Sequence, residues 1–300
     1  MDERLLLILE EFLREFEMLP AVEQVQHGTK LITGLQDVGT ELSRMRRASL
    51  HQLISEGWDL KRLASLSKRA DGESLTPTRI AQLLSTGPRP ERVLIGTSPG
   101  QVVVALGGKW EAPKANGPPC AVVSADALDA YNRLADLATA CGLRTTYEVV
   151  PPPGLVDLNR RNLVVVGSPR ILPPMAQILT ADPNHGFAAD ADGKWYLTEG
   201  DKRWRSPCDS GESADHAYIG RLKRLDGKGA VLYLAGIHGA GTRGAAHYFV
   251  DHLEEIYTQI SGVESSGVQR VRWSMLIRCD YDPETRQILS TEPLTDLKAF

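Results

Sequence analysis

The sequence has few cysteines and no apolar run long enough to cross a membrane. Its four cysteines, Cys120, Cys141, Cys208 and Cys279, form no C-x-x-C pair, which excludes zinc-finger spacing and argues against a disulfide framework. The apolar run at residues 5–9 is flanked by acidic residues and is far shorter than the roughly 20 residues of a membrane-spanning helix. We therefore expect a cytoplasmic protein with reduced thiols and no membrane partner.

Motifs for metal chemistry and for nucleotide hydrolysis are also missing. The sequence contains neither an H-E-x-x-H zinc motif nor a G-x-x-x-x-G-K-[ST] phosphate loop. Its histidines are scattered, and His247 and His252, five residues apart on a predicted helix, do not share a face. The sequence therefore predicts no metal site and no certain cofactor.

Charge, by contrast, is concentrated in particular segments. The chain holds 34 Lys and Arg against 38 Asp and Glu, a net charge of -4. Residues 1–43 contain three basic and nine acidic residues, a net charge of -6, whereas residues 44–92 contain ten basic and five acidic residues, a net charge of +5. A basic segment inside an acidic protein is typical of a nucleic-acid-binding surface, although a solvated helix face has the same composition.

Apolar spacing predicts helices throughout residues 1–92. A long helix carries Leu31, Leu35, Val38, Leu42 and Met45 at alternating steps of four and three, which is the seam of a coiled coil. This seam is expected to pack against the first helix or against a second copy of the chain. Two short helices follow, which Asp59 and Thr76 are expected to cap at their amino ends.

Residues 44–86 fit a helix-turn-helix, in which two packed helices hold the second one in the major groove of DNA. The exposed residues at the start of that helix are then Thr78, Arg79 and Gln82. Arg suits the acceptors of guanine and Gln suits adenine, so these residues are expected to read bases. The cations expected to bind phosphates are Arg44, Arg46, Arg47, Lys61 and Arg62.

The matching stretches are RMRRASLHQLISEGWDLKRLASLSK and LTPTRIAQLLSTGPRPER. Over about residues 22–92 they resemble bacterial regulators with a helix-turn-helix like that of sigma-factor region 4. The resemblance implies that double-stranded DNA is a partner. The sequence departs from it in the connection around residues 70–74, which is longer than the usual three- or four-residue turn. A helical domain that binds other proteins is the alternative interpretation.

Residues 93–300 alternate between strand-like and helix-like patterns, which predicts an α/β domain with a mixed, largely parallel sheet. The chain as a whole is thus expected to be α+β, with an all-α domain at 1–92 and an α/β domain at 93–300. The expected strands are 93–95, 102–106, 120–123, 145–150, 162–166 and 231–234, with helices at 125–141 and 242–260 and a hairpin of 273–279 with 287–291.

Two glycine-bearing loops in this second domain are candidate anion sites. After the apolar run VLYLAGI and His238 comes the string Gly239-Ala240-Gly241-Thr242-Arg243-Gly244, which satisfies G-x-G-x-x-G. Such a turn places backbone amides at a helix amino end, where a phosphate binds. The acidic residue that a dinucleotide site also needs is approximated only by Glu264. A tight turn with close packing is the other interpretation.

The second loop, Gly167-Ser168-Pro169-Arg170, follows the apolar run 162–166. Ligands of open α/β sheets bind beyond the carboxyl ends of the strands, so Arg170 and Arg243 are expected to approach one another there. The polar segment with Asp209, Glu212, Asp215 and His216 is interpreted as a solvated loop, with a lid as the alternative.

Taken together, these patterns predict a DNA-binding transcription regulator that acts as a homodimer through residues 1–45. Its α/β domain is expected to sense a small anionic ligand, either a nucleotide or another phosphate-bearing molecule. The alternatives are a nucleotide-cleaving or nucleotide-modifying enzyme with a helical oligomerisation module and His238 as the nearest base, and an adaptor that binds only proteins.

Overall fold

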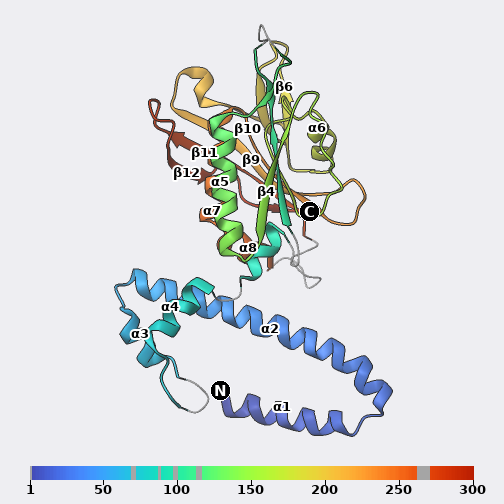
Figure 1. The fold of residues 1–300 in the computed structure, drawn as a ribbon, viewed down its shortest axis with the longest axis vertical. Coiled ribbons are helices and arrows are strands. Elements are labelled where there is room, and N and C mark those ends of the chain that lie inside the picture. The colour runs from blue at the N-terminus through green and yellow to red at the C-terminus, as the bar shows by residue number, and fades with distance from the viewer. Residues whose placement is uncertain (1, 69–71, 87–88, 97–100, 113–116, 262–270) are drawn as a thin grey trace. The chain divides into compact units, whose positions relative to one another are not determined.

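The structure is a computed structural model, and it describes residues 2–68, 72–86, 89–96, 101–112, 117–261 and 271–300. The chain forms two compact units, Met1–Pro90 and Glu91–Phe300 (Figure 1). The sequence predicts the boundary after residue 92, and the units divide after Pro90. Among the described residues, no helix combines the length and the apolar character needed to cross a membrane.

The first unit is helical. Its helices are α1 (Asp2–Glu17), α2 (Ala21–Ser55), α3 (Leu60–Leu66) and α4 (Pro77–Thr86). Both predicted caps form, because the Asp59 carboxylate accepts a hydrogen bond from the Arg62 amide at 2.7 Å and the Thr76 hydroxyl accepts one from the Arg79 amide at 3.2 Å. Gly57, at φ +89°, turns the chain out of α2 in the left-handed conformation that glycine tolerates.

The apolar core described in this unit lies where α3 and α4 pack on the end of α2. Its buried members are Leu50, Leu63, Ala64 and Ile80, with Trp58 and Leu83 half-buried around them. Of the side chains described between residues 8 and 46, none is buried. The described side chains of the amino-terminal half therefore form no core of their own.

The second unit is built on one mixed sheet, in the order β12-β11-β9-β10-β5-β1-β4, with β13 beside β11. The strands β10, β5, β1 and β4 run parallel, and β9, β11 and β12 are antiparallel to their neighbours. Their bounds are β1 Gln101–Gly107, β4 Arg144–Val150, β5 Leu163–Val166, β9 Ala214–Lys223, β10 Ala230–Gly236, β11 Trp273–Tyr281, β12 Ile288–Pro293 and β13 Lys298–Ala299.

The two faces of this sheet are covered by different elements. On one face lie α5 (Ala125–Ala140), α7 (Gly239–Asp251) and α8 (Leu253–Ser261), and on the other lie α6 (Pro174–Leu179) and a small sheet of β6 (His185–Ala189), β7 (Trp195–Glu199) and β8 (Lys202–Arg205) (Figure 1). Alternate residues of β5 supply each face, since Val164 and Val166 belong to the first core and Leu163 and Val165 to the second.

Most predicted elements of this unit are present, with three corrections. Residues 93–95 are not a strand, because they continue the 3₁₀ helix Pro90–Leu94, in which the Ile95 and Gly96 amides both donate to the Arg92 carbonyl. The helix expected at 242–260 starts at Gly239 and is divided into α7 and α8. Residues 120–123 contribute only Ala121–Val122 (β3), which pairs with Lys109–Trp110 (β2) outside the main sheet.

The terminal hairpin is confirmed in β11 and β12. No strand was predicted for β9 of the main sheet or for β6, β7 and β8 of the small sheet.

Two buried histidines lie between the main sheet and the small sheet. The His185 Nδ1 atom hydrogen-bonds the Ser274 hydroxyl at 2.7 Å, and the His216 ring packs edge-on against Trp204. The second ring nitrogen of His185 and the Nδ1 atom of His216 have no partner among the described residues. Burial lowers the pKa of His185 and also that of His216, because protonation would place a charge in this apolar layer.

We expect the second unit to lose stability as the pH falls below about 6.5. In that range the unfolded chain binds protons at both histidines while the folded chain does not, so the free energy of unfolding decreases with falling pH. Calorimetry of the full chain between about pH 7.5 and about pH 5 measures this slope. The double change His185→Gln and His216→Gln should flatten it, whereas His27→Gln with His51→Gln, both exposed, should leave it unchanged. Equal slopes in all three proteins would contradict this assignment.

Candidate functional site

The predicted DNA-reading residues lie on the outer side of α4. Thr78, Arg79 and Gln82 are exposed, while Ile80 of the same helix is fully buried against α2 and α3. The Arg79 Nη1 atom donates a hydrogen bond to the Gln82 side-chain oxygen at 3.2 Å. The two long polar side chains are therefore held next to each other on one exposed surface.

The connection between α3 and α4 is not the tight turn of a helix-turn-helix. Lys68 and Ser74 form an isolated antiparallel bridge, and the Leu75 amide donates to the Ser67 carbonyl at 2.8 Å. Residues 69–71 of this connection lie outside the described residues. The segments on either side of these residues pair in antiparallel fashion, and the helix-turn-helix geometry is not confirmed.

The predicted phosphate-binding cations divide into three groups. Arg46, Lys61 and Arg62 are exposed, and the Arg62 guanidinium lies over the Trp58 ring at 3.5 Å from its centroid. Arg44 is paired with Glu41 of the same helix at 2.7 Å. Arg47 is only 1% exposed, so its guanidinium faces the protein interior and is not available to a phosphate on the surface.

The glycine turn at the start of α7 already binds an anion, and that anion is a side chain of the same chain. The Asp215 carboxylate is fully buried. Its Oδ2 atom accepts hydrogen bonds from the His238 amide at 2.9 Å and the Gly241 amide at 2.8 Å. Its Oδ1 atom accepts from the Ser206 hydroxyl at 2.6 Å and the His216 amide at 2.8 Å. Asp215 therefore occupies the place that a ligand phosphate would take.

The glycines of this turn are needed for internal packing. A Cβ atom at Gly241 would lie 2.5 Å from Asp215 Oδ2, one at Gly239 would lie 2.3 Å from Asp126 Oδ2, and one at Gly244 would lie 2.4 Å from the Cβ atom of Cys279. These three positions accommodate neighbouring side chains of the protein. The geometry thus favours the close-packed turn over an external anion site.

The other residues assigned to this turn are also engaged internally. The Arg243 Nε atom donates to Asp129 of α5 at 2.7 Å, and its Nη1 atom donates to the Arg286 carbonyl at 2.7 Å. The Thr242 hydroxyl accepts from the Gly236 amide at 2.9 Å. His238 is the most accessible member, and its Nε2 atom lies 3.0 Å from Asp209 Oδ1.

The second loop occupies a different place from the first. Gly167 packs on the end of β1, Ser168 is buried, and the Ser168 carbonyl accepts from the Ile171 and Leu172 amides. Leu172 belongs to the core on the α6 side of the sheet, whereas α7, which carries Arg243, packs on the opposite side. The two loops follow neighbouring strands, but Arg170 and Arg243 do not converge.

Arg170 instead lines a separate pocket of about 420 Å³. Its lining residues are Gly108, Lys109, Pro152, Pro153, Arg170, Ile171 and Pro173. These residues follow the carboxyl ends of β1, β4 and β5. In the sheet, β4 lies on one side of β1 and β5 lies on the other, so the connections that leave these strands diverge at this point. Ligands of open α/β sheets collect at this kind of position.

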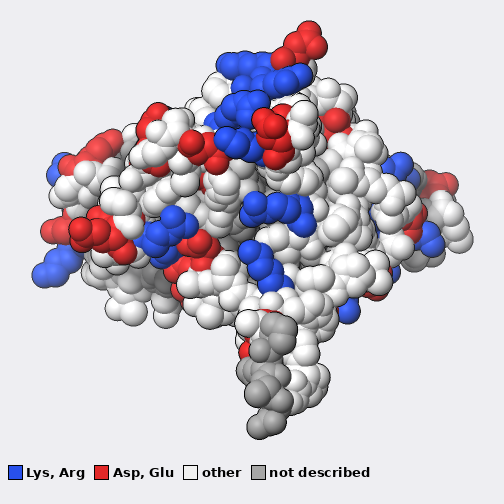
Figure 2. Space-filling model, turned by 90° about the horizontal axis from the view of Figure 1, so that it is seen from above, with Lys and Arg blue, Asp and Glu red and all other residues white. Residues whose placement is uncertain are grey.

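The pocket has a cationic rim and an apolar wall. Lys109 and Arg170 are exposed, and neither side chain pairs with another described residue. No acidic residue lines the pocket. The hairpin of β2 and β3 follows β1 at the upper end of the second unit in Figure 1. Figure 2 looks down on this end and shows a row of Lys and Arg side chains across the middle of the surface.

Comparison with known proteins adds nothing to these observations, since no family model, no curated protein and no solved structure matches the chain. Within the described residues, no three His, Cys, Asp or Glu side chains gather in a way that would hold a metal ion. Glu264, the acidic residue considered for a dinucleotide site, lies outside the described residues.

Sequence reasoning missed two residues that matter for these sites. Asp215 was assigned to a solvated loop with Glu212 and His216, yet Asp215 and His216 are buried members of β9. Residues 214–223 (ADHAYIGRLK) show no regular alternation of polar and apolar residues, so the periodicity that indicates a half-buried strand is missing from β9, which is buried on both faces. Lys109 carried no signal, because only the fold places the end of β1 beside the Arg170 loop.

We expect Asp215→Asn to destabilise the second unit by about 3 kcal/mol, because the amide nitrogen of Asn would face groups that all donate hydrogen bonds. Thermal unfolding of the full chain measures the change. The matched control is Asp209→Asn, whose carboxylate is partly exposed and, among the described side chains, contacts His238. That variant should lose less than about 1 kcal/mol. Equal losses in the two variants would show that Asp215 does not hold the start of α7.

Proposed function

We propose that the protein is a DNA-binding transcription regulator whose second unit senses a small anionic ligand. The DNA-binding part of this proposal is based on the surface of α4. Thr78, Arg79 and Gln82 are exposed there, while Ile80 anchors the helix in the core. A helix held from behind with Arg and Gln side by side on its free surface suits the base edges of the major groove.

Positive charge around this surface supports the proposal. Residues 44–92 carry a net charge of +5, and Arg46, Lys61 and Arg62 remain exposed for phosphate contacts. Arg44 and Arg47 are left out of the proposed set because the first is paired with Glu41 and the second is buried. The proposal is based on the exposed side chains of α4 and on the positive charge around them. It does not depend on the geometry of the connection between α3 and α4.

We expect the purified full chain to bind duplex DNA with an affinity that falls linearly on a log-log plot against salt concentration. Each phosphate that a Lys or Arg neutralises releases about one counterion, so the slope counts the contacts. Fluorescence anisotropy with genomic fragments measures it. Folded protein that binds no duplex at low salt would overturn the DNA half of the proposal.

Two variants separate the roles within this surface. Arg79→Ala should remove about 1–3 kcal/mol of discrimination between sequences, because it deletes a base contact. Arg46→Ala should weaken all sequences alike and lower the salt slope by about one, because it deletes a phosphate contact. Identical behaviour of the two variants would place the base-reading residues elsewhere.

The sensing half of the proposal is assigned to the pocket lined by Lys109 and Arg170. Two cations without an acidic neighbour in the lining favour a ligand with a phosphate or carboxylate group, which Arg binds in bidentate fashion. The wall of Pro152, Pro153 and Pro173 favours an apolar or flat portion on the same ligand. A nucleotide combines both features.

We expect a nucleotide panel to reveal a ligand that raises the melting temperature of the second unit. At one hundred times the dissociation constant the stabilisation is about 2.7 kcal/mol. Arg170→Ala and Lys109→Ala should each reduce the shift. Arg161→Ala, which removes an exposed cation beside the opposite end of β5, should leave it intact. A shift that survives both pocket variants would place the ligand elsewhere.

Turnover of any nucleotide would instead favour the enzyme interpretation, in which His238 beside Asp209 is the nearest base. Residues 96–100 (GTSPG) fit the hydrolase pattern G-x-S-x-G, but they precede β1 rather than follow a strand, and 97–100 lie outside the described residues. The contacts around His238 do not favour catalysis over a structural role.

A further inference from the structure

The long helix α2 carries an uncovered apolar stripe. Leu35, Val38, Leu42 and Met45 are 55%, 57%, 60% and 50% exposed. With Leu31 they repeat at steps of four and three, so they lie in one line along the helix. A line of large apolar side chains that are half exposed or more is unusual for a surface that faces only water.

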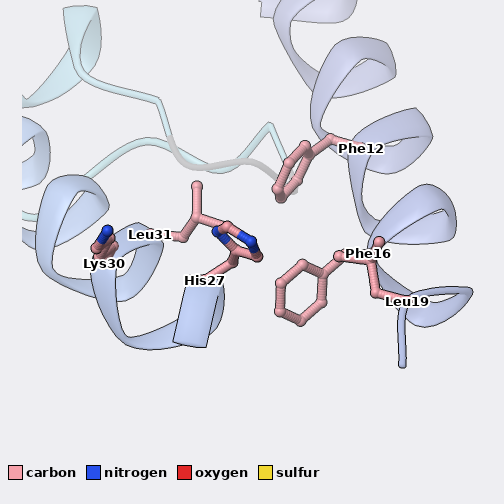
Figure 3. Close-up of a pocket in the computed structure, with 6 residues that line it drawn as sticks. All are labelled: Phe12, Phe16, Leu19, His27, Lys30 and Leu31. Carbon is pink, nitrogen blue, oxygen red and sulfur yellow. The ribbon is translucent and has the colours of Figure 1, made fainter. Parts of the chain in front are cut away.

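The hairpin of α1 and α2 also contains an open apolar pocket of about 380 Å³. It is lined by Phe12, Phe16 and Leu19 from α1 and the connection after it, and by His27, Lys30 and Leu31 from α2. Figure 3 shows the Phe12 and Phe16 rings pointing across the gap toward His27 and Leu31. Leu31 belongs to both features, so the pocket and the stripe form one continuous surface.

The described side chains of this hairpin bury little apolar surface. Between residues 8 and 46 none of them is buried. Isolated helices are marginal in water, and helices in proteins derive most of their stability from packing of an apolar face. A further apolar surface against the described faces would therefore stabilise both helices.

We propose that this further surface is the same hairpin of a second copy, so that α1 and α2 of two chains form a four-helix bundle. The hairpin is self-complementary, because it presents both projecting residues, Leu35 and Leu42, and an apolar pocket that accepts such residues. A two-fold axis pairs each feature with its counterpart in the partner. The interface is thus closed after two copies.

The available apolar area approaches what a stable dimer needs. On the stripe and on the face of α1 that carries Phe12, the large apolar residues that are at least one-third exposed are Ile8, Phe12, Leu35, Val38, Leu42 and Met45. At roughly 60–100 Å² each, these residues offer several hundred Å² per chain. Stable interfaces bury about 800 Å² on each partner.

The bundle is linked directly to the DNA-binding surface. The helix α2 continues without a break from the stripe to Leu50 and Leu53, on which α3 and α4 pack. A two-fold bundle would therefore present two copies of α4 in a fixed relation. The form of the DNA site that follows from this rests on the proposed DNA binding. The expected DNA site is then an inverted repeat.

Self-association and DNA binding are expected to respond to salt in opposite ways, because the charges involved differ in sign. Residues 1–43 have a net charge of -6, so two hairpins repel each other at low ionic strength. Salt screens this repulsion, with a Debye length of about 10 Å at 0.1 M. The dimer should therefore persist or strengthen as salt rises, whereas binding to DNA weakens.

Sedimentation of the full chain at several concentrations, in low and in high salt, tests the proposal. We expect a dimer that is retained in high salt. The double change Leu35→Glu and Leu42→Glu should shift the chain to monomer, raising the dimer dissociation constant at least a hundredfold. The control is the double change Thr29→Glu and Thr33→Glu, which adds the same two negative charges on the opposite side of α2 at exposed positions.

A monomer at all concentrations, or a dimer that the Leu35 and Leu42 changes leave intact while circular dichroism shows unchanged helix content, would overturn the proposal. Loss of helix content together with loss of the dimer supports it, since the hairpin then depends on its partner for folding. A salt-stable dimer that binds no DNA would leave this inference standing and overturn only the proposed DNA binding.

Discussion

One buried carboxylate organises the second unit at the junction of its strands and helices. Asp215 begins β9 beside the end of β10 and neutralises the amino end of α7 through the His238 and Gly241 amides. Because it also accepts from the Ser206 hydroxyl, the same group holds the segment before β9 in place. A buried charge with four donors is stable only while all four remain directed at it, so these elements depend on one another.

This constraint also decides where a ligand is able to bind. At the amino end of α7 the His238 and Gly241 amides are already directed at an internal anion, and the Asp215 carboxylate fills the space beside Gly241. The open position lies instead beyond the ends of β1 and β4, where Lys109 and Arg170 are free of acidic partners in the pocket lining. The sheet separates this pocket from Arg243, whose own charge is satisfied by Asp129 on the α5 side.

The two halves of the first unit differ in how their apolar side chains are packed. Its carboxyl-terminal half has a compact core around Leu63 and Ile80, with capped helices and an exposed polar surface on α4. Its amino-terminal half has amphipathic helices whose described side chains up to residue 46 are all at least partly exposed. One helix, α2, spans both halves, so any partner that covers the amino-terminal half also orients the surface of α4. The proposed self-association and the proposed DNA binding would therefore be coupled through α2.

Local patterns in the sequence were enough to place most helices and strands. The caps at Asp59 and Thr76, the left-handed Gly57 and the buried run of β5 depend on residues close in the chain, so they are visible without a fold. The division into a helical part and a mixed-sheet part follows from the same periodicities. The basic segment and the apolar seam are likewise properties of the sequence itself.

Only the tertiary structure decided which polar residues meet. Asp215 precedes Gly241 by twenty-six residues, and the sequence does not show that this carboxylate would fill the turn. Lys109 and Arg170 are brought together by the parallel pairing of β1 with β5, and Arg47 is buried by packing that its charge does not reveal. Charge and glycine spacing define what a segment is able to bind, whereas long-range packing determines whether its partner is a ligand or another part of the chain.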